Sequence, residues 1–279
     1  MDFTFKTYKR LITGLIFQGY EFQTFSEFAG KPVKQAVIIR HDVDRKPGNA
    51  LKMAQLEKQV GINGTYYFRA LPGSFDKKVI EQIAGMGHEI GYHYENLSTV
   101  ARRKEYRKRE TAADNRDPKD RNRKFLYKSA LNDFKKNLEM FRKLVPIKTI
   151  CMHGSPLSRF DNRDLWKVYD YRDFGIECEP YFDLDFSEVF YLTDTGRRWD
   201  GDHVNVRDRV NQTDKKRPVY RTTWDIIDAV TAGTFPLRVM ITIHPQRWSD
   251  NSFDWAWELI SQRVKNAGKR MLIRAKGSK

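Results

Sequence analysis

The sequence has little cysteine and no long apolar run. Cys151 and Cys178 are the only cysteines among 279 residues, which excludes a disulfide-built scaffold and is typical of a reducing compartment. No segment is apolar over the length needed to span a bilayer, and residues 1–6 lack the basic region and apolar core of a secretion signal. These absences predict a soluble, cytoplasmic protein without a membrane span.

Glycine-rich phosphate-binding motifs are also missing. The chain contains no loop of the Rossmann or P-loop type, and no Gly-x-Ser-x-Gly elbow surrounds Ser155. These absences argue against a nucleotide-binding loop and against a serine nucleophile. The length suits one large α/β domain or two small ones, and no repeat or long linker divides the chain. We therefore expect a single domain over residues 1–279.

Positive charge is abundant but uneven. The net charge is +15 and the pI about 9.7, and residues 101–124 hold eleven Lys or Arg against five Asp or Glu. A run of mixed sign is more typical of a solvated helix or a mobile insertion than of a nucleic-acid groove. We therefore predict a basic insertion at 101–124 and favour it over a nucleic-acid-binding surface. A surface that attracts anionic glycans, nucleotide-linked sugars or a membrane face is the alternative.

Apolar runs alternate with amphipathic segments along most of the chain. Residues 36–39 are apolar and mostly β-branched, as in a buried parallel strand, and the next residues are polar. Three strand-helix units in succession predict an α/β fold with a parallel sheet, open or closed. Further strands are expected at 65–69, 88–93, 147–152, 176–178, 189–192 and 237–243, and helices at 5–20, 48–60, 79–86, 125–144, 223–232 and 254–267.

Ionisable side chains follow four of these strands. They are Asp42 and Asp44, His93, His153 and His244. Because ligands of α/β folds bind beyond the carboxyl ends of the strands, we expect these residues to share one site. Oxygen and nitrogen ligands without thiolates favour zinc or another divalent metal, which activates water for amide or ester hydrolysis. The alternative for the two aspartates is that they only cap the helix that follows.

Three segments carry a family resemblance. Residues 36–44 with their acidic end, the segment Gly87-His88-Glu89-Ile90-Gly91-Tyr92-His93, and the late strand ending in Ile243-His244 stand in this order. Together they resemble the polysaccharide deacetylase superfamily, which carries the nodulation-type chitooligosaccharide deacetylase domain, and the chain is similar to a divergent member. The resemblance implies an irregular (β/α) barrel of about seven parallel strands, in agreement with the alternation above.

The resemblance also implies roles for individual residues. Asp42 matches the catalytic base, His244 the general acid, and His93 the first metal-binding histidine. Asp44 is the candidate for the acidic metal ligand, one residue later than in the family. The second histidine of the family falls at Leu97, which cannot bind a metal.

Two residues compete for the place of that missing ligand. Glu95 is near it in sequence, but we prefer His153 because it ends a strand that opens at the same mouth. His153 is instead a substrate contact if it takes the place of the arginine and proline motif of the family. His41 and His88 are expected to orient the site or to pack beneath it.

The loop after residues 189–192 is rich in aromatic and charged residues. Asp194, Arg198 and Trp199 are candidates for sugar contacts, because aromatic faces with nearby carboxylates suit carbohydrate stacking and hydroxyl binding. Roles in the core or in turns are the alternative for each of them. Substrates consistent with such a loop are carbohydrates or nucleotide-linked sugars.

These observations predict a metal-dependent hydrolase, most consistent with zinc, that removes an N-acyl or O-acyl group from a sugar or a glycan precursor. Two other classes stay open. The altered metal motif is also typical of a catalytically inactive barrel that binds a glycan or a protein partner. A basic nucleic-acid-binding protein is the third class, and it predicts steeply salt-dependent binding.

Overall fold

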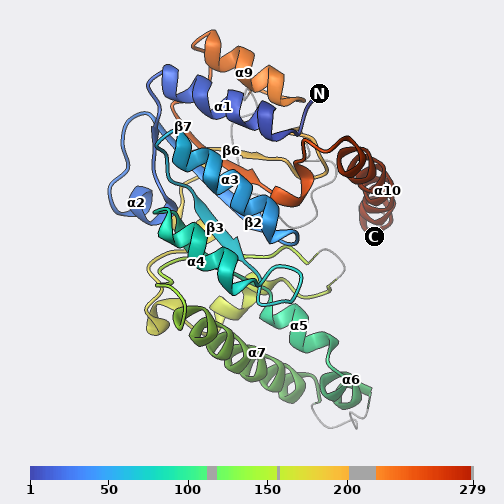
Figure 1. The fold of residues 1–279 in the computed structure, drawn as a ribbon. Coiled ribbons are helices and arrows are strands. Elements are labelled where there is room, and N and C mark those ends of the chain that lie inside the picture. Colours follow the sequence, from blue (N-terminus) through green and yellow to red (C-terminus); the bar gives the residue numbers. More distant parts are fainter. Residues whose placement is uncertain (112–117, 156–157, 201–217, 278–279) are drawn as a thin grey trace.

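Seven parallel β-strands form one sheet in the computed structural model of the chain (Figure 1). The structure describes residues 1–111, 118–155, 158–200 and 218–277. The strands are β1 (Glu21–Phe22), β2 (Ala36–Val43), β3 (Thr65–Phe68), β4 (Glu89–Tyr94), β5 (Ile150–Met152), β6 (Phe190–Thr193) and β7 (Arg238–Ile243).

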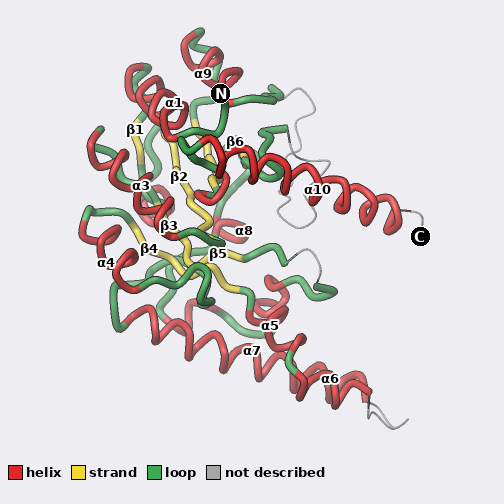
Figure 2. The backbone as a smooth tube through the Cα atoms, turned by 45° about the vertical axis from the view of Figure 1, so that its right-hand side comes forward, coloured by secondary structure: helices red, strands yellow, loops and turns green. Residues whose placement is uncertain are grey.

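Helices cover the sheet, and Figure 2 shows α10 extending away from it. No helix among the described residues is both long and apolar enough to cross a bilayer. The α-helices are α1 (Phe5–Phe17), α2 (Phe25–Gly30), α3 (Pro47–Gln59), α4 (Lys77–Gly85), α5 (Asn96–Arg102), α6 (Lys104–Thr111), α7 (Pro118–Arg142), α8 (Pro180–Asp183), α9 (Thr223–Thr231) and α10 (Ser252–Gly277). Short 3₁₀ helices are η1 (Asn162–Lys167), η2 (Tyr171–Phe174) and η4 (Pro245–Arg247).

The order of the strands is that of an open barrel. The sheet runs β5-β4-β3-β2-β7-β6, with β1 paired to β2 beside this path. Each strand from β2 to β5 lies next to its predecessor, and β7 returns to pair with β2, so the order is cyclic and interrupted only between β5 and β6. The sheet is therefore curled into a half-barrel with surrounding helices, which confirms the predicted (β/α) barrel class.

The gap between β5 and β6 is partly filled by residues predicted to form a strand. Residues 176–178 make a single parallel bridge, Thr149 to Cys178, and no full strand. Directly after the bridge, Glu179 caps α8, accepting a hydrogen bond from the Tyr181 amide at 2.6 Å, and it also accepts one from Met152 of β5 at 3.0 Å. The strand prediction is corrected because this cap turns the chain into a helix instead of extending it along β5.

Two helices differ from their predicted bounds. α7 begins at Pro118, whereas the apolar pattern predicted a start at residue 125, and α10 continues to Gly277, past the predicted end at 267. Apolar periodicity detects only helix that packs on a core, whereas both extra segments are rich in Lys and Arg. Most of the basic insertion at 101–124 is accordingly helical, in α5, α6 and the start of α7, while residues 112–117 lie outside the described residues.

Alternation along β2 separates a helix-facing side from the barrel interior. Val37 and Ile39 pack in one cluster with residues of α1, whereas Ala36 and Ile38 pack in another with Met240 of β7. Every residue of β2 is buried, including the polar ones at its carboxyl end. Because successive side chains of a strand point to opposite faces, Arg40 and Asp42 follow Ala36 and Ile38 into the interior. The apolar base of the barrel thus supports a polar layer at its mouth.

His41 and His88 lie outside the barrel, as the alternation predicts. His41 Nε2 is 2.6 Å from Glu57 Oε1, and His88 Nδ1 is 3.4 Å from Glu57 Oε2. The hydroxyls of Tyr8 and Tyr66 also donate to this carboxylate, which is fully buried between α3 and the sheet. The two histidines therefore fix α3 and α1 to the sheet beneath the site.

Gly91 has a steric role in the barrel interior. A Cβ at this position would lie 2.2 Å from the Tyr67 ring, and the Tyr67 hydroxyl donates to Thr149 at 3.1 Å. The ring of Tyr67 therefore crosses β4 over the bare glycine backbone and reaches Thr149, the residue before β5. This layer lies directly below His93, since residues 91 and 93 point to the same face of β4.

We predict that Gly91→Ala lowers the free energy of unfolding by about 1–3 kcal/mol, because the added methyl overlaps a buried aromatic ring. Urea denaturation measures this change. Gly85→Ala in α4 is the control, since a Cβ there meets nothing within 4 Å. Equal stability of the two variants would contradict the proposed overlap.

Glu179 makes stability depend on pH. Burial raises the pKa of its carboxyl from 4.5 to about 8, against the lowering effects of the Met152 amide and Arg40. Between these values the folded protein holds a proton that the unfolded chain has lost, so the contribution of Glu179 to stability falls as pH rises, by at most about 1.4 kcal/mol per pH unit.

We therefore expect the stability of Glu179→Gln, relative to wild type, to increase as pH rises from 4.5 to about 8. Urea denaturation of both proteins across this window gives the difference. A difference that does not change with pH would show that Glu179 has an ordinary pKa in the folded state.

Candidate active site

Asp42 lies at the carboxyl end of β2, held by an arginine of its own strand. Arg40 donates from Nε to Oδ1 at 2.8 Å and from Nη2 to Oδ2 at 2.6 Å, and both side chains are buried. Burial raises the pKa of Asp42, but Arg40, His93 and His244 outweigh burial and leave it below its usual value. Asp42 is therefore an ionised carboxylate with a fixed orientation.

A second carboxylate, Asp44, faces two histidines. Its Oδ1 lies 3.4 Å from His153 Nε2 and 3.7 Å from His93 Nε2. This oxygen is buried, and no described residue donates a hydrogen bond to it. The nearest cation is Arg69, whose Nη1 is 3.9 Å away, while Gln246 Nε2 donates to the other oxygen at 3.2 Å. A buried carboxylate oxygen without a donor is costly unless a cation or water completes it.

The hydrogen bonds of Nδ1 in His93 and His153 determine whether Nε2 of each ring carries a proton or a lone pair. His93 Nδ1 is 3.0 Å from the Cys151 carbonyl oxygen, which can only accept, so Nδ1 carries the proton. His153 Nδ1 is 3.1 Å from Ser155 Oγ and 3.3 Å from Glu95 Oε2, which again favours a proton on Nδ1. In the neutral rings each Nε2 is then a lone pair directed at Asp44 Oδ1. This pattern of outer hydrogen bonds is typical of metal-ligating histidines.

The charges of the pocket agree with that arrangement. Burial lowers the pKa of His93 to about 4, although Asp42 and Asp44 raise it, so the ring is neutral near neutral pH. Burial raises the pKa of Asp44, but His153, His244 and His93 hold it far below its usual range. An ionised carboxylate and neutral imidazoles are the protonation states that bind a divalent cation.

Glu95 lies behind His153 instead of beside Asp44. Its Oε1 accepts from Arg69 Nε at 2.7 Å, and its Oε2 accepts from the Ser155 hydroxyl at 3.3 Å. Burial raises the pKa of Glu95, but His153 and Arg69 lower it to about 2. Leu97 is fully buried in the core on α5. His153 therefore lies next to His93, whereas Glu95 and Leu97 do not.

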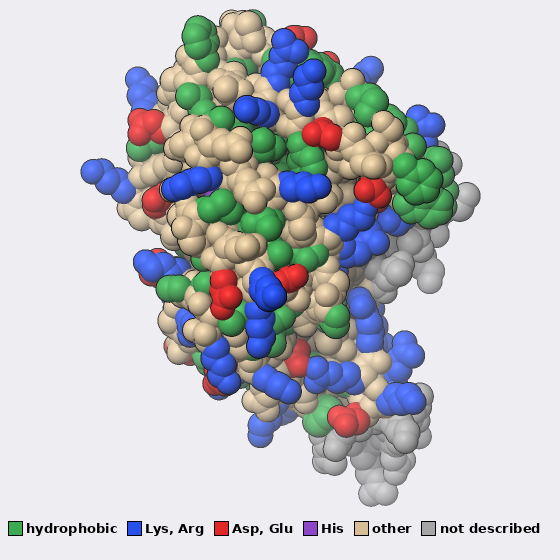
Figure 3. Space-filling view, in the orientation of Figure 1, with side chains coloured by type: hydrophobic (Ala, Val, Ile, Leu, Met, Phe, Trp, Pro, Cys, Tyr) green, Lys and Arg blue, Asp and Glu red, His purple; other side chains and the backbone are tan. Residues whose placement is uncertain are grey.

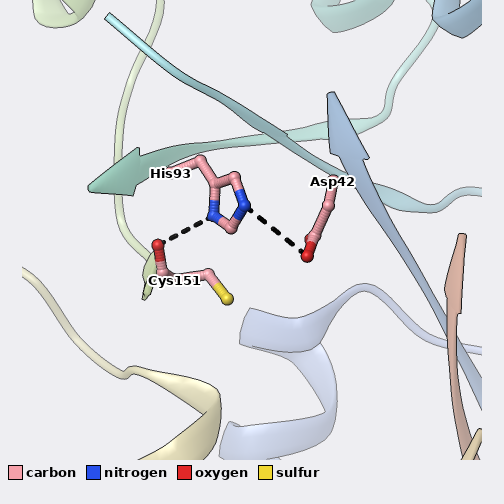
Figure 4. Close-up of side chains that lie close together, drawn as sticks. All are labelled: Asp42, His93 and Cys151. Carbon is pink, nitrogen blue, oxygen red and sulfur yellow. Dashed lines mark hydrogen bonds and ion pairs between the residues drawn. The ribbon is translucent and has the colours of Figure 1, made fainter. Parts of the chain in front are cut away.

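Cys151 is a further candidate ligand that sequence reasoning missed. Asp42, His93 and Cys151 each offer a ligand atom, and these atoms lie within 4.8 Å of one another (Figure 4). Cys151 pairs in register with His93. It stands two residues before His153, so Cys151 and His153 both face the interior. That spacing was the available signal. This set is less suited to a divalent cation, since the charge of Asp42 is already paired with Arg40.

His244 ends β7 and lies across from Asp42. Ile243 pairs with His41 in the β2·β7 register, so the next residue of each strand faces the interior. His244 Nδ1 is 2.6 Å from Asp194 Oδ1, and the His244 amide donates to Asp194 Oδ2 at 3.0 Å. Asp194 thus fixes the orientation of the ring and leaves Nε2 available to exchange a proton in the site.

The three residues predicted to contact a sugar follow β6 in the chain, and each has a protein partner. Asp194 is fully buried and also accepts from Trp248 Nε1 at 2.8 Å and from Arg247 Nη1 at 2.6 Å. Trp199 is buried, donates to Thr223 at 2.9 Å and packs near Trp248. Arg198 is half exposed and pairs with Asp200 at 2.7 Å. Asp194 therefore orients His244, Trp199 supports the core, and direct sugar contact by these residues stays a prediction.

Comparison with known proteins gives only distant likenesses. No protein-family model and no curated protein matches the chain. Among solved structures, a wild-type CE4 family pseudoenzyme from Bacillus anthracis matches with 11% identity and a TM-score of 0.42, over 85% of this chain and 62% of that one. A mutant of that pseudoenzyme with restored enzymatic activity matches with 12% identity and a TM-score of 0.42, over 85% and 65%. The match spans less than two thirds of that protein, so functional assignment rests on the residues of this chain.

The two possible ligand sets make opposite predictions. We expect His153→Ala to weaken zinc binding by at least about 100-fold, since even outer partners of metal ligands are worth about 10–100-fold. Cys151→Ser should leave the affinity unchanged. Competition with a chromophoric chelator measures both values. The reverse pattern would assign the metal to Asp42, His93 and Cys151.

Proposed function

We propose that the chain is a metal-dependent hydrolase that removes an N-acyl or O-acyl group from a sugar or a glycan precursor. It would be a divergent member of the polysaccharide deacetylase superfamily, the superfamily that carries the nodulation-type domain. The observation that carries the proposal is the buried Asp44 Oδ1, which accepts no hydrogen bond from any described residue and faces the Nε2 atoms of His93 and His153.

The donor set fits a divalent metal, most consistent with zinc. Asp44, His93 and His153 would hold it, because one carboxylate and two imidazoles with an open position are typical of catalytic zinc sites. When bound, such a metal polarises an acyl oxygen and acidifies a water molecule. The outer partners Ser155 and Glu95 keep His153 in place, and the Cys151 carbonyl does so for His93.

Asp42 is the group suited to take a proton from the attacking water. Arg40 occupies both of its oxygens and leaves the carboxylate ionised, with Oδ2 3.6 Å from His93 Nε2. It therefore stands beside the proposed ligands without having to serve as one. A positioned carboxylate of this kind is a general base.

His244 is the group suited to protonate the leaving amine or alkoxide. It stands on the neighbouring strand, and its Nδ1 is held by Asp194, so Nε2 can carry the transferred proton. In the overall reaction the water oxygen bonds to the acyl carbon and the carbon–nitrogen or carbon–oxygen bond breaks. Asp42 accepts one proton of the water and His244 supplies one to the leaving atom, so the protons balance.

One observation favours a second function. Leu97 stands where the family has its second metal-binding histidine, and it is buried in the core, away from the mouth. If His153 does not replace that ligand, the barrel keeps its fold and loses the chemistry. The chain would then be an inactive barrel that binds a glycan or a protein partner.

We predict that Asp42→Asn lowers the rate of acetate release from acetylated chitooligosaccharides by about 10²–10⁴-fold, because the amide cannot accept the proton of water. The zinc content should stay unchanged, since Asp42 is not among the proposed ligands. Asp228→Asn, an exposed site on α9, is the matched control. Full activity of Asp42→Asn on any substrate that the wild type hydrolyses would refute the assignment of the base.

A further inference from the structure

The outer face of α10 is apolar. Four large apolar side chains along it are exposed, and they form a hydrophobic patch over α10 at the right of Figure 3. Successive members are four, three and four residues apart, so they form one stripe along the helix. They are Phe253 (79% exposed), Trp257 (63%), Ile260 (57%) and Val264 (69%).

The inner face of α10 is mostly polar, the opposite of an ordinary surface helix. Glu258, Gln262 and Asn266 are buried, and Asn266 Nδ2 donates to the Gly196 carbonyl at 2.9 Å. Near the start of the helix, Trp255 Nε1 donates to the Asp2 carbonyl at 2.6 Å. These contacts fix the rotation of α10. An amphipathic helix normally buries its apolar stripe, so this stripe indicates a partner outside the domain.

The charge of the helix indicates the chemistry of that partner. Residues 263–276 contain six Lys or Arg and no Asp or Glu, in a chain with a net charge of +15. A second copy of α10 would bring two basic segments together, which opposes self-association. The positive charge would instead attract an acidic surface, both at long range and in direct contact.

We propose that α10 docks on an anionic lipid bilayer, with its apolar stripe in the interface and its basic residues at the headgroups. Helices that lie on membranes carry Trp and Phe on an apolar face and Lys and Arg outside that face. The sequence of α10 contains both groups of residues. Each basic residue near an anionic leaflet adds to the attraction. The helix also extends away from the sheet (Figure 2), and the four side chains of the stripe are each more than half exposed.

Docking would place the bilayer beside the mouth of the barrel. Asp254, in the first turn of α10, lies with its Oδ1 3.6 Å from Lys46 Nζ, and Lys46 follows Asp44 by two residues. The docking surface therefore begins next to the strand end that carries the proposed ligand. The docking itself does not depend on the reaction proposed above, and the experiment below uses no activity measurement.

Sedimentation with lipid vesicles tests the proposal on the full chain. We expect the wild type to bind phosphatidylcholine vesicles that contain phosphatidylglycerol, and not vesicles of phosphatidylcholine alone. The double variant Trp257→Ser/Ile260→Ser should bind at least about tenfold more weakly, because it removes apolar area that enters the interface. The matched control is Phe17→Ser/Leu237→Ser, which removes two exposed apolar side chains, 89% and 54% exposed, outside α10.

Charge is tested separately with Arg263→Glu/Lys265→Glu, which should also weaken binding to the anionic vesicles. All four positions altered on α10 are exposed, so circular dichroism should show unchanged folding. Equal binding by the stripe variant and its control would overturn the proposal, as would equal binding of the wild type to neutral vesicles. A wild-type dimer that becomes monomeric in the stripe variant, with no vesicle binding, would identify a second copy as the partner.

Discussion

The structure of the site depends on one buried carboxylate oxygen to which no described residue donates a hydrogen bond. This atom, Asp44 Oδ1, lies 3.4 Å from His153 Nε2 and 3.7 Å from His93 Nε2, and both nitrogens carry lone pairs when the rings are neutral and protonated at Nδ1. Three centres of negative charge density in a buried pocket repel one another unless a cation lies between them. The outer hydrogen bonds of both rings hold this arrangement in place. A divalent metal bound there, as we propose, would remove the repulsion.

The barrel explains how residues distant in sequence reach this point. The cyclic strand order brings β7 back beside β2, so His244 and Asp42 become neighbours although about two hundred residues separate them. The open edge between β5 and β6 is closed only in part, by the bridge at Cys178 and the cap at Glu179. Parallel pairing places every carboxyl end at the same mouth, and α10 leaves the domain from that side.

Much of this arrangement was predictable from sequence. The rest was unpredictable, and the causes are physical. Strand ends could be predicted because apolar runs stop abruptly at Asp42, His93, His153 and His244, and barrels collect such ends. The hydrogen-bond partners of these residues could not be predicted. The pairing of Asp42 with Arg40, and of His244 with Asp194, depends on rotamers and on contacts between strands. No local sequence pattern encodes these. The charged start of α7 and the outward stripe of α10 were missed because apolar periodicity was taken to mark packing on the core.

Anomalous diffraction from crystals soaked in zinc is the most direct test of the proposed metal site. We expect one strong peak between Asp44 Oδ1, His93 Nε2 and His153 Nε2, at the distances of about 2.0–2.2 Å that zinc keeps from oxygen and nitrogen ligands. A peak among Asp42, His93 and Cys151 would contradict the assignment of Asp42 as a base. Absence of any peak in the barrel at full zinc saturation would contradict the metal site itself.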